Sequence, residues 1–255
     1  MNSSRGMDTL HVLTYNIHKG FSQFKRRMAM HELRARLQEI SPDLVFLQEV
    51  VGFHEESAEQ HVNWPSLPQY EFLADSVWED FAYGRNAIAD TGHHGNAVLS
   101  KFPIARWDNE DVSMHRLENR GLLHCEIGIP GWKKPLHAIN VHFGLLKRWR
   151  SQQLSALVQR IERLVPHDAP LIIAGDFNDW TRRASTHLQV ALDVHEVFES
   201  TARAPARSFP AAMPVLQLDR IYVRGFDVRL AHVHRGRPWA KISDHVALSA
   251  LLALQ

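Results

Sequence analysis

The sequence predicts a mixed α/β fold, because short apolar strand-like runs are interleaved with two stretches that have helical spacing. No low-complexity linker and no repeat of fixed period divides the 255 residues. The hydrophobic content of 45% is enough for a substantial core. We therefore predict a flexible N-terminus over residues 1–9 and a single domain over residues 10–255.

Nine apolar runs have the length and composition typical of strands. In chain order they cover residues 10–17, 43–50, 70–76, 96–102, 121–129, 135–143, 170–177, 218–225 and 244–254. Segments rich in proline, glycine or charge are predicted to be loops, at 51–69, 77–95, 103–120 and 201–217. Long loops in compact domains often line functional sites.

Two segments carry apolar residues at helical spacing. The first, residues 30–40, has Met30, Leu33 and Leu37 on one face, and the second covers residues 154–165. A single apolar stripe is what a surface helix needs, so we predict that both helices pack on a sheet and that neither binds a cofactor.

Composition limits the location and the partners. The 29 basic and 28 acidic residues nearly cancel, so affinity for nucleic acid would have to come from a local patch. No segment resembles a signal peptide or approaches the roughly 18 apolar residues of a membrane span, and we expect a cytoplasmic protein. The single cysteine, Cys125, excludes an internal disulfide and is predicted to pack within a strand.

Six of the strand-like runs bring carboxylates, amides or imidazoles to their ends. The residues concerned are Asn16, Gln48, Glu49, Asn140, His142, Asp176, Asn178, Asp219, Ser243, Asp244 and His245. Each fragment alone fits a capped turn. Together they are harder to explain structurally, because polar groups beside buried runs cost on the order of several kcal/mol unless they are paired, solvated or bound to metal.

The ligand set of such a metal site would be rich in oxygen. Its members are Glu49, Asp176, Asp219 and Asp244, with the amides of Asn16 and Asn178. Oxygen ligands suit Mg²⁺ or Mn²⁺ better than Zn²⁺. There is no cysteine pair and no H-E-x-x-H, and we expect the histidines at 93–94 and 232–234 to be ordinary polar positions.

The motifs as an ordered set resemble the endonuclease/exonuclease/phosphatase superfamily, which includes DNase I, exonuclease III, neutral sphingomyelinases and inositol polyphosphate 5-phosphatases. The matching segments are "TYNIHKG", "LQEV", "GNAVLSKFPI", "NRGLL", "INVHFG", "AGDFND", "LDRIYV" and "SDHVAL". The resemblance implies a four-layer α/β/β/α sandwich, in which two mixed sheets pack face to face with helices outside. It also implies one divalent-metal site at an edge of the sheets.

The resemblance further implies a role for each motif residue. Glu49 corresponds to the principal ligand of Mg²⁺ or Mn²⁺, with Asn16 and Asp244 near the metal. Asp176 resembles the residue that orients and activates the attacking water, and Asn178 presents its amide to the phosphate. This last role requires an extended backbone, because side chains two residues apart on a strand face the same way.

Two histidines complete the implied site. His245 resembles the imidazole that contacts the scissile phosphate, paired with Asp219, and such a pair should raise the histidine pKa. His142 resembles the second imidazole of the DNase I and sphingomyelinase branches, and the absence of a tyrosine motif there argues against repair of abasic sites. No counterpart of the second glutamate of DNase I relatives is evident. Residues that could contact substrate instead are Tyr83, Arg85, Asn96 and Arg120.

The sequence thus predicts a metal-dependent phosphoesterase that cleaves a phosphodiester by in-line attack of an activated water. Nucleic acid is one candidate substrate, and a phospholipid or inositol phosphate is the alternative. Basic clusters at 147–153 and 181–183 would attract a polyanion, or would only form a solvated surface. A non-catalytic binding module is a third hypothesis, but it predicts missing catalytic side chains. No obligate protein partner is evident.

Overall fold

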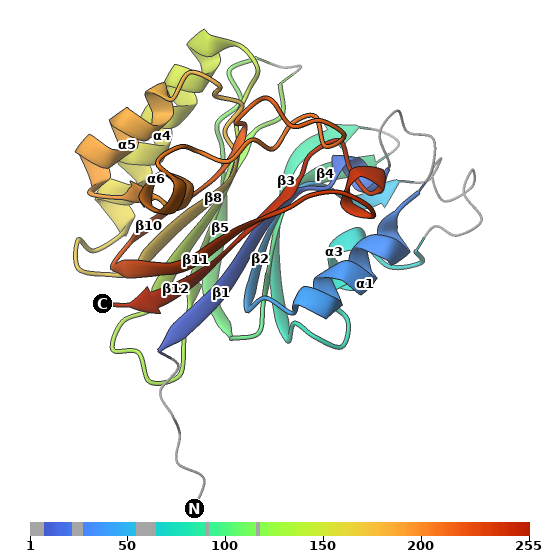
Figure 1. Ribbon diagram of the computed structural model, residues 1–255, viewed down its shortest axis with the longest axis horizontal. Coiled ribbons are helices and arrows are strands. Elements are labelled where there is room, and N and C mark those ends of the chain that lie inside the picture. The colour runs from blue at the N-terminus through green and yellow to red at the C-terminus, as the bar shows by residue number, and fades with distance from the viewer. Residues whose placement is uncertain (1–7, 22–27, 55–64, 90–91, 116–117) are drawn as a thin grey trace, which may run out of the picture.

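Two six-stranded sheets pack face to face, with helices on both outer sides (Figure 1). The computed structural model describes residues 8–21, 28–54, 65–89, 92–115 and 118–255. The first sheet has the order β11 (Phe226–His234), β12 (Ala247–Leu254), β1 (Thr9–Asn16), β2 (Leu44–His54), β4 (Gly92–Ser100) and β3 (Asp80–Ala89). The second has the order β5 (Ile104–Asp111), β6 (Gly121–Ile127), β7 (Leu136–His142), β8 (Leu171–Asp176), β10 (Asp219–Arg224) and β9 (His195–Glu196). The predicted four-layer sandwich is confirmed.

Each sheet is mixed and has one parallel pair among its described strands. These two pairs explain the positions of helices α1 (Met30–Ile40) and α4 (Lys147–Leu164). Strands β1 and β2 are parallel, as are β7 and β8. Parallel neighbours need a long crossover connection, usually a helix. Helix α1 connects the first pair and α4 the second. Both helices predicted from apolar spacing are therefore crossovers, and α4 begins seven residues before the predicted segment.

Three apolar cores separate the four layers. The core between the sheets includes Val12, Phe46 and Ile172. A second core lies under α1 and α3 (Gln69–Ala74), and a third lies under α4 and α5 (Arg183–Leu192). Strands covered on both faces read as continuous apolar runs, which is why the central strands were visible in the sequence. Cys125 is fully buried in the core between the sheets, and burial raises the pKa of its thiol.

The segment 70–76 was predicted to be a strand, and this is wrong. Residues 69–74 form α3, and the side chains of Leu73 and Ala74 are buried against the first sheet, with Tyr70 partly buried beside them. The spacing of three and four residues places these side chains on one helical face. A short apolar run does not by itself distinguish a strand from a buried helix.

Two predicted loops contain edge strands. The segment 77–95 includes β3, and 103–120 includes β5, whose residues are mostly exposed. An edge strand can be charged and polar because its outer side faces solvent, so its sequence lacks an apolar run. Strand β11 and helices α5 and α6 (Val197–Ala202) were also not predicted.

The two ends of the described chain meet in the first sheet. Thr9 pairs with Ala253 and Thr14 with Leu248, in an antiparallel ladder between β1 and β12. We propose on this ground that residues 10–255 form a single domain. Residues 1–7 of the predicted flexible N-terminus lie outside the described part of the chain. No helix within that described part is long and apolar enough to cross a membrane.

A buried histidine pair on the outer side of the second sheet predicts sensitivity to acid. His124 in β6 and His137 in β7 lie with Nε2 and Nδ1 3.0 Å apart. Burial, with the charges of His137 and Arg160, lowers the pKa of His124 to about 3, and burial also lowers the pKa of His137. In the unfolded chain His124 takes up a proton near pH 6.5. This contribution to stability is therefore complete above that pH and is lost as the pH falls toward 3.

Between pH 7 and pH 4.5 the free energy of unfolding should fall less in His124→Gln than in the wild type, by about 2 kcal/mol. Glutamine can still hydrogen-bond to His137 but does not titrate. Urea unfolding at both pH values measures the effect, with the exposed His187→Gln in α5 as the control. Equal pH dependence of the His124→Gln variant and the wild type would show that the pair does not govern acid stability.

Candidate active site

Strand ends from both sheets converge on Asp176, the last residue of β8. The parallel register places His142 of β7 opposite Asp176, and the antiparallel register places Asp219, the first residue of β10, opposite it on the other side. Asn16 ends β1 in the facing sheet, and its Nδ2 donates to Asp176 Oδ2 at 3.2 Å. The two sheets therefore contact each other through polar side chains at this edge.

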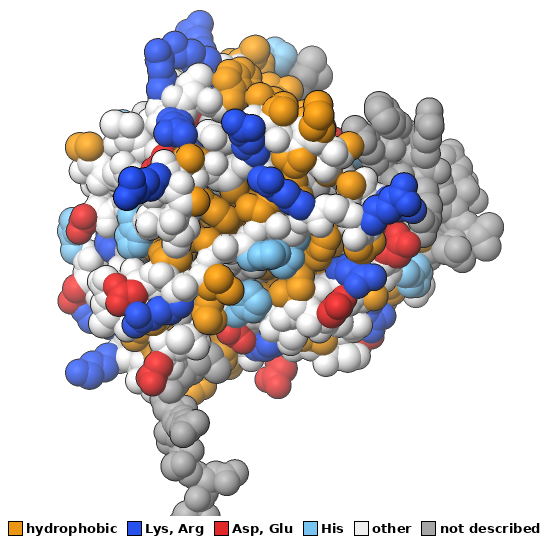
Figure 2. Space-filling view, viewed as in Figure 1, with side chains coloured by type: hydrophobic (Ala, Val, Ile, Leu, Met, Phe, Trp, Pro, Cys, Tyr) orange, Lys and Arg blue, Asp and Glu red, His pale blue; other side chains and the backbone are white. Residues whose placement is uncertain are grey.

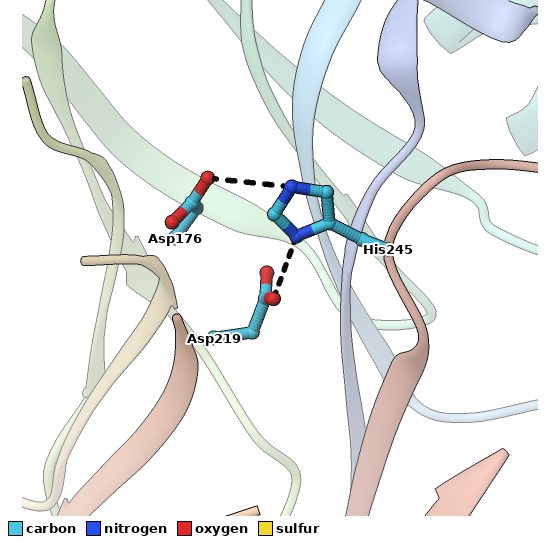
Figure 3. A group of neighbouring side chains, drawn as sticks. All are labelled: Asp176, Asp219 and His245. Atoms are coloured by element: carbon cyan, nitrogen blue, oxygen red, sulfur yellow. Dashed lines mark hydrogen bonds and ion pairs between the residues drawn. The ribbon is translucent and has the colours of Figure 1, made fainter. Parts of the chain in front are cut away.

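The ring of His245 lies between two carboxylates, with one nitrogen facing each (Figure 3). Nδ1 is 2.7 Å from Asp219 Oδ2, and Nε2 is 3.9 Å from Asp176 Oδ2. The backbone N–H of His245 donates to Ser243 Oγ at 3.2 Å, and that hydroxyl donates to the carbonyl of Asn16 at 2.7 Å. The segment before β12 is thus attached to the end of β1, which fixes the position of the ring.

Burial and charge set the protonation of these groups. Burial alone would lower the pKa of His245, but Asp219 and Asp176 raise it to about 10, so the ring is an imidazolium at neutral pH. Burial and the Asp219 carboxylate raise the pKa of Asp176 to about 6. Burial, followed by the charge of Arg120, lowers the pKa of His142. One charged and one neutral imidazole therefore flank the Asp176 carboxylate.

Asn178 reaches the site through a turn, and the expected extended backbone is wrong. Its φ is 48°, in the left-handed region that asparagine tolerates better than most residues. Its backbone N–H donates to Asp176 Oδ1 at 2.9 Å, and its Nδ2 donates to the carbonyl of Phe143 at 2.8 Å. The same Nδ2 lies 3.4 Å from Asp176 Oδ2. The side-chain amide of Asn178 is therefore held beside the carboxylate.

Glu49 was predicted at a strand end, but β2 continues past it to His54. The register of β2 against β4 shifts between Leu47 and Val50, and Glu49 has a φ of 56° within this irregularity. Such a bulge can re-aim a side chain toward a site. Glu49 Oε1 lies 3.5 Å from Asn16 Nδ2, so Asn16 stands between Glu49 and Asp176.

Asp244 joins the site through His18, a residue that was not singled out in the sequence. Asp244 Oδ1 is 3.8 Å from His18 Nδ1, and the backbone N–H of His18 donates to Asn16 Oδ1 at 3.1 Å. His18 lies in the 3₁₀ helix η1 (His18–Gly20) and has a left-handed φ of 47°. Its place two residues after Asn16 in the motif "TYNIHKG" was the available signal.

Two buried amides support the site from the space between the sheets. Gln48 Nε2 donates to Asn140 Oδ1 at 2.8 Å. Asn140 Nδ2 in turn donates to the carbonyls of Leu47 and Ala97, each at 2.8 Å. Both side chains are fully buried. They connect β2 and β4 of the first sheet to β7 of the second.

The segment 201–217, expected to line a site, contributes Ser208 and Phe209. Ser208 Oγ accepts from the backbone N–H of Asp219 at 3.1 Å, and the backbone carbonyl of Ser208 accepts from the N–H of Val246 at 2.8 Å. The Phe209 ring lies 5.0 Å from the ring of His245, centroid to centroid. This loop therefore joins the segments that carry Asp219 and His245.

The four residues predicted to contact substrate fall into two pairs. Asn96 is buried in β4 and donates to the carbonyl of Gly121 at 3.1 Å, and Arg120 directly precedes β6, where its charge acts on His142. Tyr83 and Arg85 lie on β3 instead. Tyr83 stacks on Tyr70 of α3, with ring centroids 4.4 Å apart, and Arg85 is exposed. Among the described residues no hydrogen bond, ion pair or ring contact joins Tyr83 or Arg85 to the group of Asp176, Asp219 and His245.

The donor set fits a hard divalent cation. One ligand atom from each of Asp176, Asp219 and His245 lies within 4.8 Å of the others. Buried Asp219 Oδ1 has no hydrogen-bond partner among the described residues. An imidazolium has no free lone pair, so the charged form of His245 is a hydrogen-bond donor and not a ligand. The carboxylate and amide oxygens remain as the candidate ligands.

Comparisons with known proteins, by sequence and by structure, agree with the fold described above. The profile of the Endonuclease/Exonuclease/phosphatase family matches residues 13–245. The uncharacterized protein YbhP of Escherichia coli strain K12 is 46% identical over 95% of this chain and 96% of its own length. The endonuclease/exonuclease/phosphatase from Bacteroides vulgatus superposes with a TM-score of 0.76 at 18% identity, over 97% of this chain and 99% of that one. The D. rerio TDP2 complexed with single strand DNA product gives a TM-score of 0.70 at 19% identity, over 96% and 98% of the two chains.

Proposed function

Since the chain belongs to the endonuclease/exonuclease/phosphatase family, we propose that it hydrolyses a phosphodiester, in a reaction that needs Mg²⁺ or Mn²⁺. The observation that carries the proposal is the buried group of Asp176, His245 and Asp219 at the meeting point of the two sheets. Burying two carboxylates beside each other is unfavourable for folding, and such an arrangement is typical of functional sites.

Glu49, Asn16 and Asp244 would hold the cation. Glu49 is half-buried, and its one hydrogen bond within the described part of the chain is the long 3.5 Å approach of Asn16 Nδ2, so its oxygens are available to a ligand. A bound divalent cation neutralises phosphate charge and polarises the P–O bonds. The positive φ of Glu49 supports this role, because strain of this kind persists where a site requires it.

Asp176 is the group we assign to orienting and deprotonating the attacking water. A pKa of about 6 is close to the value that suits a general base at neutral pH. The Asn178 amide and the His245 imidazolium are donors beside it, placed to stabilise negative charge on the phosphate oxygens. Asp219 keeps His245 charged and oriented, and neutral His142 lies 3.6 Å from Asp176 Oδ2.

Nucleic acid is the first candidate substrate. The D. rerio TDP2 structure is a complex with a single strand DNA product, and a strand of nucleic acid is a chain of phosphodiesters. On the face shown in Figure 2, Lys and Arg side chains are scattered among apolar, histidine and acidic ones. With a formal net charge of +1, we expect a short footprint on the strand, with few phosphate contacts and a shallow salt dependence.

A phospholipid or inositol phosphate is the alternative, and exposed apolar side chains near the site favour it. Leu145 and Leu146 follow the segment that accepts the Asn178 hydrogen bond and are 64% and 54% exposed. Met213 and Val215, in the loop that carries Phe209, are 71% and 51% exposed. Such residues could touch a lipid surface.

A substrate panel distinguishes these possibilities. Purified protein is assayed with single-stranded DNA, RNA, phosphatidylcholine and phosphatidylinositol vesicles, and phosphomonoesters, in Mg²⁺ and in EDTA, beside Asp176→Ala and His245→Ala. We expect cleavage of a diester that EDTA and both substitutions abolish. Activity that survives EDTA or either substitution would contradict the mechanism, and inactivity on every substrate would favour a binding module.

Glu49→Gln should weaken binding of Mg²⁺ by at least about 10–100-fold, the loss typical even for partners that only support a ligand. Glutamine keeps the size of the side chain and removes the charge that the cation needs. Isothermal titration calorimetry of metal-stripped protein measures the change without relying on activity. Glu162→Gln, on the exposed face of α4, is the matched control. Equal Mg²⁺ affinity in Glu49→Gln and wild type would exclude Glu49 as a ligand.

A further inference from the structure

Three histidines flank one strand on the outer side of the first sheet, and none of the roles assigned above uses them. His232 and His234 lie on β11, and His11 lies on β1. The strand order places β12 between these two strands. Val12 and Val233 face the core between the sheets, so the histidine side chains beside them point to the outer side. Figure 2 shows histidine side chains gathered among apolar ones at the front of the molecule, where Figure 1 draws these three strands.

The outer side of these strands is hollowed by a cavity of 120 Å³. Leu251 of β12 pairs with His11 on one side and with Leu230 on the other, so the cavity spans β12 from β1 to β11. The apolar core under α1 and α3 includes neither Leu230 nor Leu251, and Leu230 is 60% exposed. The residues that line the cavity are His11, Leu230, His232, Ser249, Ala250 and Leu251. Helices α1 and α3 therefore leave this part of the sheet open to a ligand.

His232 and His234 are close enough to bind one ion together. Their ring centroids are 4.6 Å apart. An imidazole nitrogen binds Zn²⁺ at about 2.0–2.1 Å, which places the ring centroid roughly 3 Å from the ion. The centroids of two rings on one ion are thus at most about 6 Å apart. The observed distance is within this limit.

Ser249 holds His234 in the way that is typical of a metal-binding histidine. Its Oγ is 2.9 Å from Nε2 of His234. A histidine ligand usually donates its second ring N–H to an oxygen, which fixes the ring and leaves the other nitrogen for the ion. Burial, followed by the charges of His232 and His11, lowers the pKa of His234 to about 4. The ring is therefore neutral at pH 7 and keeps a lone pair for an ion.

His11 lines the same cavity from β1, and its side chain can turn toward the pair on β11. The backbone N–H of His11 donates to Asp43 Oδ2 at 2.8 Å, whereas its ring forms no hydrogen bond with any described residue. Within the described part of the chain, the ligand atoms of the three histidines do not all lie within 4.8 Å of one another. A third bond to an ion therefore requires rotation of the His11 side chain.

We propose that His232, His234 and His11 form a second metal site, which binds a transition metal ion such as Zn²⁺ and joins β11 to β1 across β12. Neutral imidazole suits Zn²⁺, Cu²⁺ and Ni²⁺, whereas Mg²⁺ and Mn²⁺ prefer oxygen ligands such as those of the active site. Among the described strands β11 has β12 as its only neighbour, so the ion would hold this edge to the sheet. The sequence indicated ordinary polar positions at 232–234, because His11 lies at the other end of the chain and only the sheet brings it near.

Zn²⁺ binding tests the site, measured by isothermal titration calorimetry of metal-stripped protein in millimolar Mg²⁺, which occupies the active site. We expect one Zn²⁺ per chain. His232→Gln and His11→Gln should each weaken binding at least about tenfold. His167→Gln, at an exposed position, is the control and should bind as the wild type does. In the same buffer Zn²⁺ should raise Tm of the wild type but not of His11→Gln, because an ion that binds only the folded state stabilises it.

Electron paramagnetic resonance of Cu²⁺-loaded protein identifies the ligands. The wild type should show coupling to imidazole nitrogens that is lost in His232→Gln and kept in His142→Gln, which removes an imidazole of the active site. No Zn²⁺ binding, or equal Zn²⁺ affinity in the wild type and His232→Gln, would overturn the proposal. So would a nitrogen coupling lost only in His142→Gln, because the ion would then lie in the active site. An effect of His232→Gln without one of His11→Gln would overturn the bridge to β1.

Discussion

Replacing Asp176 by asparagine is expected to lower kcat by about 10²–10⁴-fold, the contribution typical of a general base. Asparagine has nearly the same shape and can keep the hydrogen bond from the Asn178 N–H, but it cannot take a proton from water. KM should change much less than kcat. Steady-state kinetics on the best diester of the substrate panel measures both values.

The same substitution should increase stability, which separates loss of chemistry from loss of fold. Burial and Asp219 raise the pKa of Asp176. Ionising this carboxylate in the folded protein, above about pH 6, therefore lowers the free energy of unfolding. In metal-stripped protein Asp176→Asn should therefore raise Tm at pH 7 and have little effect at pH 4. If Asp176→Asn retains more than a tenth of the wild-type kcat, Asp176 is not the general base.

Replacing Arg220 by methionine is expected to lower the free energy of unfolding by about 3–5 kcal/mol, the loss typical of breaking a buried charged network. Arg220 lies in β10 directly after Asp219 and is fully buried. Nη2 donates to the carbonyls of Asp179 and Gln217, and Nη1 donates to Ser185 Oγ at 3.1 Å. The guanidinium thus connects the turn that carries Asn178 to the segment that carries Asp219.

For a chain of this length the loss corresponds to a fall in Tm of about 6–20 °C. Thermal unfolding followed by circular dichroism measures it. Arg229→Met, which removes a side chain that is 59% exposed on β11, is the control and should change Tm by less than about 2 °C. A fall no larger than that of the control would show that the buried network contributes little to stability.

The sequence predicted the centre of each sheet and missed the edges. Strands such as β7 and β8 lie between two cores, so every residue is apolar or paired and the run is recognisable. Strand β5 has few buried side chains, and its sequence "IARWDNED" resembles a surface loop. Segment 70–76 was apolar for a different reason, since one face of a short helix packs on the first sheet.

The site was predicted as a set of residues, but its geometry was not. Asp176, Asp219 and His142 end or begin strands, and strand pairing brings such residues together. Glu49 and Asn178 depend on left-handed backbone conformations that no spacing rule indicates. Arg220 alternates with buried apolar residues, a pattern typical of a solvent-facing side chain. It is buried because the carbonyls of Asp179 and Gln217 and the Ser185 hydroxyl accept hydrogen bonds from its guanidinium. Two of these partners, Asp179 and Ser185, are 41 and 35 residues away in the sequence, so no local pattern indicates them.

We propose that a water oriented by Asp176 attacks phosphorus directly, with no covalent intermediate on the protein. The stereochemical outcome at phosphorus tests it, with a chiral phosphorothioate diester hydrolysed in ¹⁸O-labelled water in the presence of Mg²⁺. A single in-line displacement predicts inversion of configuration. Retention would require two displacements through a covalent intermediate on the enzyme, and it would contradict the role assigned to Asp176.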